Sequence, residues 1–216
     1  MSPRAGITLA EVLVVAGILA ILAALAAPVV SSVLELAQRT ACQSNLRQLG
    51  MAFMTYAQQH DQRLPADSTF GIDDPRRSPA WFHRLPGELD AADVRGPRSV
   101  LQCPSYRFAG AEVFANATPK SYKMNTYLDA SGRPRHYRLG RFSGESALVL
   151  MVDAVAGETG MGQWGHAPYT AVTAERHGCA CVLHLDCRTT THHAAPPGAP
   201  QAWRDALTWL PEGRRP

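Results

Sequence analysis

Eight side chains of types that commonly bind metals crowd into the segment from residue 177 to residue 193. They are His177, Cys179, Cys181, His184, Asp186, Cys187, His192 and His193. Thiolates and imidazoles are typical zinc ligands in structural sites, so a zinc site is the first chemistry that this segment could support. Such sites commonly use Cys-x-x-Cys pairs, however, whereas a single residue separates Cys179 from Cys181.

Strand alternation argues for a plainer role of these thiols. On a strand, one face would carry Cys179, Cys181, Leu183, Leu185 and Cys187, and the other Ala180, Val182, His184 and Asp186. Cysteines in line with leucines are typical of buried apolar thiols. With Cys42 and Cys103 the chain has five cysteines, and we expect them to be buried thiols or disulfide partners. His192 and His193 follow in a segment flanked by threonines and prolines, which we predict to be a loop.

Glu11 is the only ionisable side chain in the 24 residues from Ile7 to Val30. A helix of that length rises about 36 Å, which is enough to cross the roughly 30 Å hydrocarbon core of a bilayer. A carboxylate inside a membrane costs about 2.5 kcal/mol or more on insertion scales, so such a group is expected to be functional and to have a partner. No cationic side chain lies within a helical turn of Glu11.

The residues around Glu11 carry a family resemblance. The run Gly6-Ile7-Thr8-Leu9-Ala10-Glu11 resembles the class III leader of type IV pilins and of type II secretion pseudopilins. In those proteins a prepilin peptidase cuts after the glycine and methylates the new amino terminus. The resemblance implies that residues 1–6 are a leader, that the cut falls between Gly6 and Ile7, and that Glu11 meets the Ile7 amine of a neighbouring subunit. It also implies that Pro28 kinks the helix.

A helical pattern continues beyond this apolar run. Cys42, Leu46, Leu49, Phe53 and Tyr56 recur at spacings of four, three, four and three, which places them on one apolar stripe. The stripe must be covered, and we expect a sheet built by the rest of the chain to cover it. The helix should end before Pro65, which disfavours helical geometry at the residue preceding it. We therefore divide the chain into a transmembrane helix (7–30), an amphipathic continuation (31–62) and a head (63–216).

The head shows a strand pattern with few helical segments. Residues 147–153 form a short apolar run typical of a buried strand, and residues 179–186 are predicted to pair with it in antiparallel fashion. Residues 122–128 are expected to be a strand or extended segment. One helical turn near residues 81–85 and a short amphipathic helix over 202–210 complete the pattern. The predicted fold is α+β and pilin-like: a long N-terminal helix packed on a small antiparallel sheet.

The second half of the chain adds to the resemblance. Its motifs are residues 42–50 (CQSNLRQLG), Cys103-Pro104-Ser105, residues 122–128 and Arg176-His177-Gly178. Together they resemble a large bacterial subgroup of pseudopilin-like proteins in which nine residues separate a histidine from an Asp-Gly pair. Here eight residues separate His177 from Asp186, and Cys187 replaces the glycine. Any turn geometry that relies on that glycine is therefore in question, whereas the strand before it is not.

Two further kinds of site are weighed against plainer interpretations. Major pseudopilins of type II secretion systems can hold calcium, and Asp153, Glu158 and Asp186 could supply oxygen ligands. Their spacing matches no calcium motif, so we expect no cofactor and interpret Asp153 and Asp186 as carboxylates that end strands and cap turns. The alternative is a calcium site that uses Asp153 and Asp186. A basic cluster could contact single-stranded nucleic acid; it comprises Arg133, Arg135, Arg138 and Arg141. A solvated hairpin loop is the favoured interpretation, because the net charge of +3 is nearly balanced.

These features favour a structural subunit over an enzyme, since the sequence shows no nucleophile elbow, phosphate loop or paired carboxylates. The resemblance implies a pseudopilin of a type II secretion-like system, anchored once in the bacterial inner membrane with its head in the periplasm or outside. Its partners would be prepilin peptidase, membrane lipid, related subunits of a short fibre, and an inner-membrane assembly platform with its ATPase. The alternatives are a minor type IV pilin for adhesion, motility or DNA uptake, and a membrane-anchored metal-binding or enzymatic domain.

Overall fold

The computed structural model describes residues 8–68, 72, 74, 76–89, 99–106, 120–128, 138–139, 146–154, 165–174, 176–193 and 201–209. The chain divides into two compact units, Met1–Ala37 and Gln38–Pro216. Helix α1 (Leu9–Gln59) has residues in both units.

In the first unit, α1 has apolar side chains that no described residue of the same unit covers. The large ones between Leu9 and Leu36 are 52% to 79% exposed. By length and composition this helix can cross a membrane. It continues through Pro28, whose carbonyl oxygen accepts hydrogen bonds from the hydroxyls of Ser31 and Ser32 at 2.9 and 3.1 Å. The kink at Pro28 stays a prediction.

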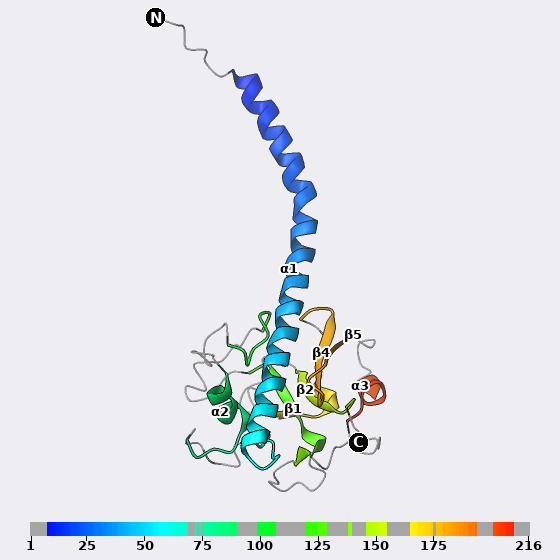
Figure 1. Cartoon of the computed structure of the whole chain (residues 1–216). Coiled ribbons are helices and arrows are strands. Elements are labelled where there is room, and N and C mark those ends of the chain that lie inside the picture. Colours follow the sequence, from blue (N-terminus) through cyan, green and yellow to red (C-terminus); the bar gives the residue numbers. More distant parts are fainter. Residues whose placement is uncertain are drawn as a thin grey trace, which may run out of the picture. The chain divides into compact units, whose positions relative to one another are not determined.

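The second unit is built on a sheet (Figure 1). Its strands are β1 (Tyr122–Asn125), β2 (Val149–Asp153), β3 (His166–Ala167), β4 (Cys179–His184) and β5 (Thr189–His193). They lie in the order β3-β1-β2-β4-β5. The pairs β1–β2, β2–β4 and β4–β5 are antiparallel, while the two-residue β3 lies parallel to β1. The described helical segments of this unit, besides α1, are α2 (Trp81–Arg84), η1 (Leu85–Glu88), η2 (Thr126–Leu128), η4 (Tyr169–Ala171) and α3 (Gln201–Ala206).

The strand predictions agree with this sheet in most places. The antiparallel pairing of β2 with β4 is confirmed, with Val152 opposite Val182, and all five residues of β2 are buried. The extended segment at Tyr122 is a strand only as far as Asn125, after which the chain turns into η2. The predicted loop at His192 and His193 is wrong. These residues belong to β5, because β-branched threonines precede them and β4 offers an antiparallel partner.

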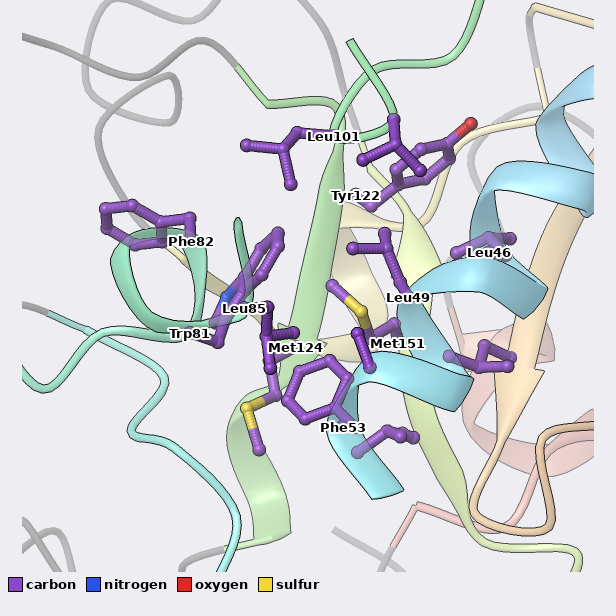
Figure 2. Packing of buried hydrophobic residues seen from close by; sticks show 14 of the residues in the cluster. Leu46, Leu49, Phe53, Trp81, Phe82, Leu85, Leu101, Tyr122, Met124 and Met151 are labelled. Carbon is purple, nitrogen blue, oxygen red and sulfur yellow. The ribbon is translucent and has the colours of Figure 1, made fainter. Parts of the chain in front are cut away.

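The second half of α1 covers one face of the sheet. Cys42, Leu46, Leu49 and Phe53 are fully buried, as the stripe predicts, whereas Tyr56 is only partly buried. Figure 2 shows Leu49 and Phe53 pointing from the helix toward Met124 and Met151 of the sheet. Burial of each large apolar side chain contributes about 1.5–3 kcal/mol. The α+β arrangement of a long helix on an antiparallel sheet is therefore confirmed.

The opposite face of the sheet is covered by the C-terminal segment. Val152 and Val182 pack there with Trp203 and Trp209. A register shift in β2 between residues 149 and 151 interrupts the alternation of faces, as a β-bulge does. Asn125 fixes the segment, since its Nδ2 donates to the carbonyl oxygens of Val149 and Trp209 at 2.9 and 2.8 Å. The predicted C-terminal helix is present as α3 but ends at Ala206, because Thr208 instead forms a bridge with Leu148. Leu210, also predicted to be part of the helix, lies outside the described residues.

Helix α1 ends at Gln59, earlier than predicted. Asp61 and Gln62 adopt left-handed conformations, with φ angles of 55° and 57°. The N–H of Gln62 donates to the Ala57 carbonyl at 2.8 Å. The helix is therefore terminated by this turn, and Pro65 follows after the break. The helical turn expected near residue 81 is confirmed as α2 and η1.

Gly165 provides a test of the packing around α2. Its carbonyl oxygen accepts hydrogen bonds from Trp81 Nε1 and from the N–H of Met124, both at 2.8 Å. A Cβ atom here would lie 2.2 Å from the Asp67 carbonyl oxygen. We expect Gly165→Ala to lower the free energy of unfolding by about 1–3 kcal/mol, the usual cost of overpacking. Urea unfolding of the full chain in detergent, followed by tryptophan fluorescence, measures it.

The matched control is Gly87→Ala in η1, because a Cβ atom there meets nothing within 4 Å. Its free energy of unfolding should change by no more than about 0.5 kcal/mol. Equal stabilities of the two variants would contradict the close approach at Gly165.

Candidate functional site

At the start of α1, Thr8 and Glu11 form a reciprocal cap. The N–H and the hydroxyl of Thr8 both donate to Glu11 Oε2 at 2.8 Å. The N–H of Glu11 in turn donates to Thr8 Oγ1 at 3.3 Å. Threonine before the helix and glutamate at its third residue are the signature of a capping box. Sequence reasoning searched for a cation and missed this Thr-x-x-Glu signal.

The hydrogen bonds of the cap come from neutral donors. Both Thr8 donors are neutral, and the Glu11 side chain is exposed. A carboxylate held in this way remains available to a cation from another molecule. Gly6 and Ile7, the predicted processing residues, lie outside the described part of the chain.

A second group of polar side chains meets in the interior of the second unit. Cys42 comes from α1, Cys103 from the segment before β1, Asp153 from the end of β2, and His177 from the turn before β4. All four are buried, and one potential ligand atom from each lies within 4.8 Å of the others. We call this group the Cys-His-Asp cluster.

Backbone contacts hold the Cys103 segment against both α1 and the sheet. The N–H of Cys103 donates to Ser121 Oγ at 2.7 Å. Asn45, one turn after Cys42 on α1, donates through Nδ2 to the Gln102 carbonyl oxygen at 2.9 Å. The motif residues around Cys42 and Cys103 thus dock onto each other.

His177 reaches the cluster from a turn that leads directly into β4. Gly178 has a φ angle of 64°, in the left-handed region that favours glycine. The Nε2 atom of His177 lies 2.8 Å from Cys103 Sγ. Its Nδ1 atom is buried and has no hydrogen-bond partner among the described residues. Such a buried polar atom costs about 1–3 kcal/mol.

Asp153 is held by a buried ion pair with Arg176. The guanidinium donates through Nη1 to Asp153 Oδ1 and through Nη2 to the Ala154 carbonyl oxygen. The side chains of Asp153 and Arg176 are 0% and 6% exposed. Burial raises the pKa of Asp153 to about 7, although the Arg176 guanidinium lowers it. Asp153 Oδ2 has no hydrogen-bond partner in the part of the chain that the structure describes.

The thiols of the cluster are stabilised in their neutral form. A hydrogen bond with Cys42 and burial both raise the pKa of Cys103, and together they outweigh the opposite effect of His177. All five cysteines of the chain are free thiols. Cys179 and Cys181 are buried on β4, and Cys181 lies in the same core as Cys42.

Cys187 occupies the turn between β4 and β5. Its φ angle is 64°, so the turn keeps the left-handed geometry that a glycine would adopt more easily. Its thiol lies over α1, where a Cβ atom at Gly50 would be 3.2 Å from Cys187 Sγ. Asp186 Oδ1 accepts a hydrogen bond from the N–H of Arg188 at 3.0 Å and so caps this turn.

The remaining predicted ligands are not brought to one site. In the β2–β4 ladder, His184 pairs with Val149 at one end, and Asp186 lies just beyond that end. Asp153 lies at the opposite end of the same ladder. His184 and His192 instead contact the same hydroxyl, that of Thr190, at 2.8 and 2.9 Å. Of the basic cluster, Arg138 is described and pairs with Asp61; Arg133, Arg135, Arg141 and the predicted ligand Glu158 lie outside the described residues.

The described residues form a pilin-like α+β arrangement with a long, hydrophobic N-terminal helix. Residues 1–27 match the family described as the prokaryotic N-terminal methylation motif. No curated protein and no solved structure gave a significant match. The motif and the helix together indicate a membrane-anchored, type IV pilin-like protein, with α1 as the one candidate span among the described residues. The motif implies processing by prepilin peptidase and assembly with pilin-like subunits.

Proposed function

We propose that this chain is a structural pseudopilin of a type II secretion-like system, cut after Gly6 and assembled into a short fibre through α1. The observation that carries the proposal is the N-terminal segment itself. It combines the methylation motif, an apolar helix surface without cover in its own unit, and a carboxylate that neutral donors hold at the helix start. A lone membrane anchor needs the apolar surface but not the other two features.

Assembly in this proposal follows from charge pairing in an apolar medium. Cleavage after Gly6 creates an amine at Ile7, and the Glu11 carboxylate of a neighbouring subunit neutralises it. Two opposite charges that meet within a helix bundle avoid the cost that each would have alone in hydrocarbon. The exposed apolar side chains of α1 then pack against equivalent helices. An inner-membrane platform and its ATPase would extract the subunits from the bilayer one by one.

The head is proposed to have a structural role and no catalytic one. The alternative assembly is a type IV pilus, which would use the same N-terminal chemistry. Deletion of the gene separates the two: loss of secreted proteins with normal surface pili supports the pseudopilin, and the reverse supports the pilin.

Gly6→Val tests the processing step. The peptidase must accommodate the residue before the cut closely, so valine should leave a full-length precursor without a methylated terminus. The mass of the intact protein extracted from membranes measures this. Gly17→Val is the matched control, because a Cβ atom at Gly17 meets nothing within 4 Å, and this variant should begin at Ile7. A mature mass in the Gly6→Val variant would overturn the assignment of the cleavage site.

A further inference from the structure

We propose that the Cys-His-Asp cluster binds one structural zinc ion. Its ligands are Cys42 Sγ, Cys103 Sγ, a ring nitrogen of His177 and a carboxylate oxygen of Asp153. The ion would cross-link α1, the segment before β1, the end of β2 and the turn before β4. This site is distinct from the histidine- and cysteine-rich segment 177–193, of which only His177 takes part.

The positions of the four donors suit a closed tetrahedral site. Zinc binds sulfur at about 2.3 Å and nitrogen or oxygen at about 2.0–2.2 Å, which separates neighbouring ligand atoms by about 3.3–3.8 Å. The four atoms of the cluster lie within 4.8 Å of one another. Cys103 Sγ and His177 Nε2, now 2.8 Å apart, would move to about 3.5 Å if Nε2 is the ligand. A change of that size requires only small rotations of the two side chains.

Two buried polar atoms of the cluster favour a metal ligand. Asp153 Oδ2 and His177 Nδ1 have no hydrogen-bond partner among the described residues, although both are fully buried. A zinc ion supplies a partner for Oδ2 directly and fixes the imidazole ring through one of its nitrogens.

The charges of the site also balance. Zinc binding displaces the thiol protons of Cys42 and Cys103 into solvent, which leaves two thiolates and one carboxylate around a dication. The resulting charge of −1 is neutralised by Arg176, whose buried guanidinium donates to Asp153. Arg176 thus acts as a positioning residue that holds the carboxylate and completes the neutrality of the site.

The donor set favours zinc over the other chemistries that sequence analysis considered. Calcium takes oxygen ligands, whereas two of these four donors are sulfur. A disulfide bond between Cys42 and Cys103 would use the thiols but would leave Asp153 Oδ2 without a partner. Zinc accounts for all four side chains at once.

Metal analysis of the full-length chain, purified in detergent without chelator, tests the proposal. We expect about one zinc per chain. Cys103→Ser should lose most of the zinc, whereas Cys187→Ser, a thiol in the β4–β5 turn outside the cluster, should retain it. Replacement of zinc by Co²⁺ in the unmutated chain should give the visible bands of tetrahedral cobalt and thiolate-to-cobalt absorption in the near ultraviolet.

Measurements on the unmutated chain test the proposal even if a variant fails to fold. A chelator should lower its melting temperature, and added zinc should restore it. Two results would overturn the proposal. One is an intact mass two hydrogens lower, with Cys42 and Cys103 joined in a disulfide and no metal bound. The other is free thiols in a folded chain that takes up neither zinc nor Co²⁺.

Discussion

Glu11→Gln should abolish fibre assembly and leave processing intact. Glutamine at the third helical position can still take part in a capping box, so the start of α1 is preserved. What disappears is the negative charge that would meet the Ile7 amine of the next subunit. That amine would then enter the apolar bundle without a charged partner, and a single uncompensated charge in hydrocarbon costs several kcal/mol. The helix itself should insert at least as readily as before.

Cross-linking of intact cells measures the effect. The Glu11→Gln variant should give processed monomer without a ladder of multimers. Thr8→Val is the complementary control, because it removes the hydroxyl that donates to Glu11 at 2.8 Å and keeps the carboxylate. Loss of that cap costs about 1 kcal/mol of helix stability, so its ladder should persist. Multimers of normal intensity in Glu11→Gln would mean that another contact drives assembly.

The long helix and the buried strands were predictable because their signals are local. Leu46, Leu49 and Phe53 are spaced as one helical face, and that face is the one buried against the sheet. The first four residues of β2 are apolar, and all five residues of the strand are buried. Strand alternation likewise placed Cys181 and Leu183 on one face, and both pack in the core with the residues of α1. In these segments hydrophobic periodicity and tertiary packing agree.

The Cys-His-Asp cluster was not predictable in the same way, because its members are far apart in sequence. Cys103 and His177 lie 74 positions apart and meet at 2.8 Å. Sequence reasoning compared His177 with the cysteines nearest to it along the chain, whereas the fold brings it to Cys103. One signal in the sequence could have indicated the cluster: Cys42, Cys103 and His177 each lie in one of the motif segments that carry the family resemblance. Their convergence depends on how α1 docks on the sheet, which periodicity does not specify.

Turn chemistry accounts for the smaller differences. Asp61 and Gln62 end α1 by adopting left-handed conformations, which two non-glycine residues rarely do. Cys187 adopts a left-handed conformation as well, because it lies in the turn that joins β4 to β5. In both places tertiary contacts override the local preference of the residue.

Arg176→Met should destabilise the second unit by about 3–5 kcal/mol, because it leaves Asp153 buried without its cation. Methionine fills much of the space of the arginine side chain but cannot donate to Asp153 Oδ1 or to the Ala154 carbonyl oxygen, both of which Arg176 now satisfies. It also loses the stacking of the guanidinium over the Tyr106 ring, whose centroid is 5.0 Å away. The loss should appear as a lower urea midpoint at an unchanged slope.

The four tryptophans all follow residue 80, so their fluorescence reports on the second unit even when the first unit is held in detergent. Unfolding should be measured with chelator present, so that the ion pair is tested without metal. Arg188→Met removes an exposed pair with Asp186, at 3.7 Å, and should cost no more than about 1 kcal/mol. The double variant Arg176→Met with Asp153→Leu should recover most of the stability, because neither charge of this ion pair is then left without its partner. A loss below about 1 kcal/mol for Arg176→Met alone would show that Asp153 does not depend on this guanidinium, since removal of one partner from a buried pair costs more than that.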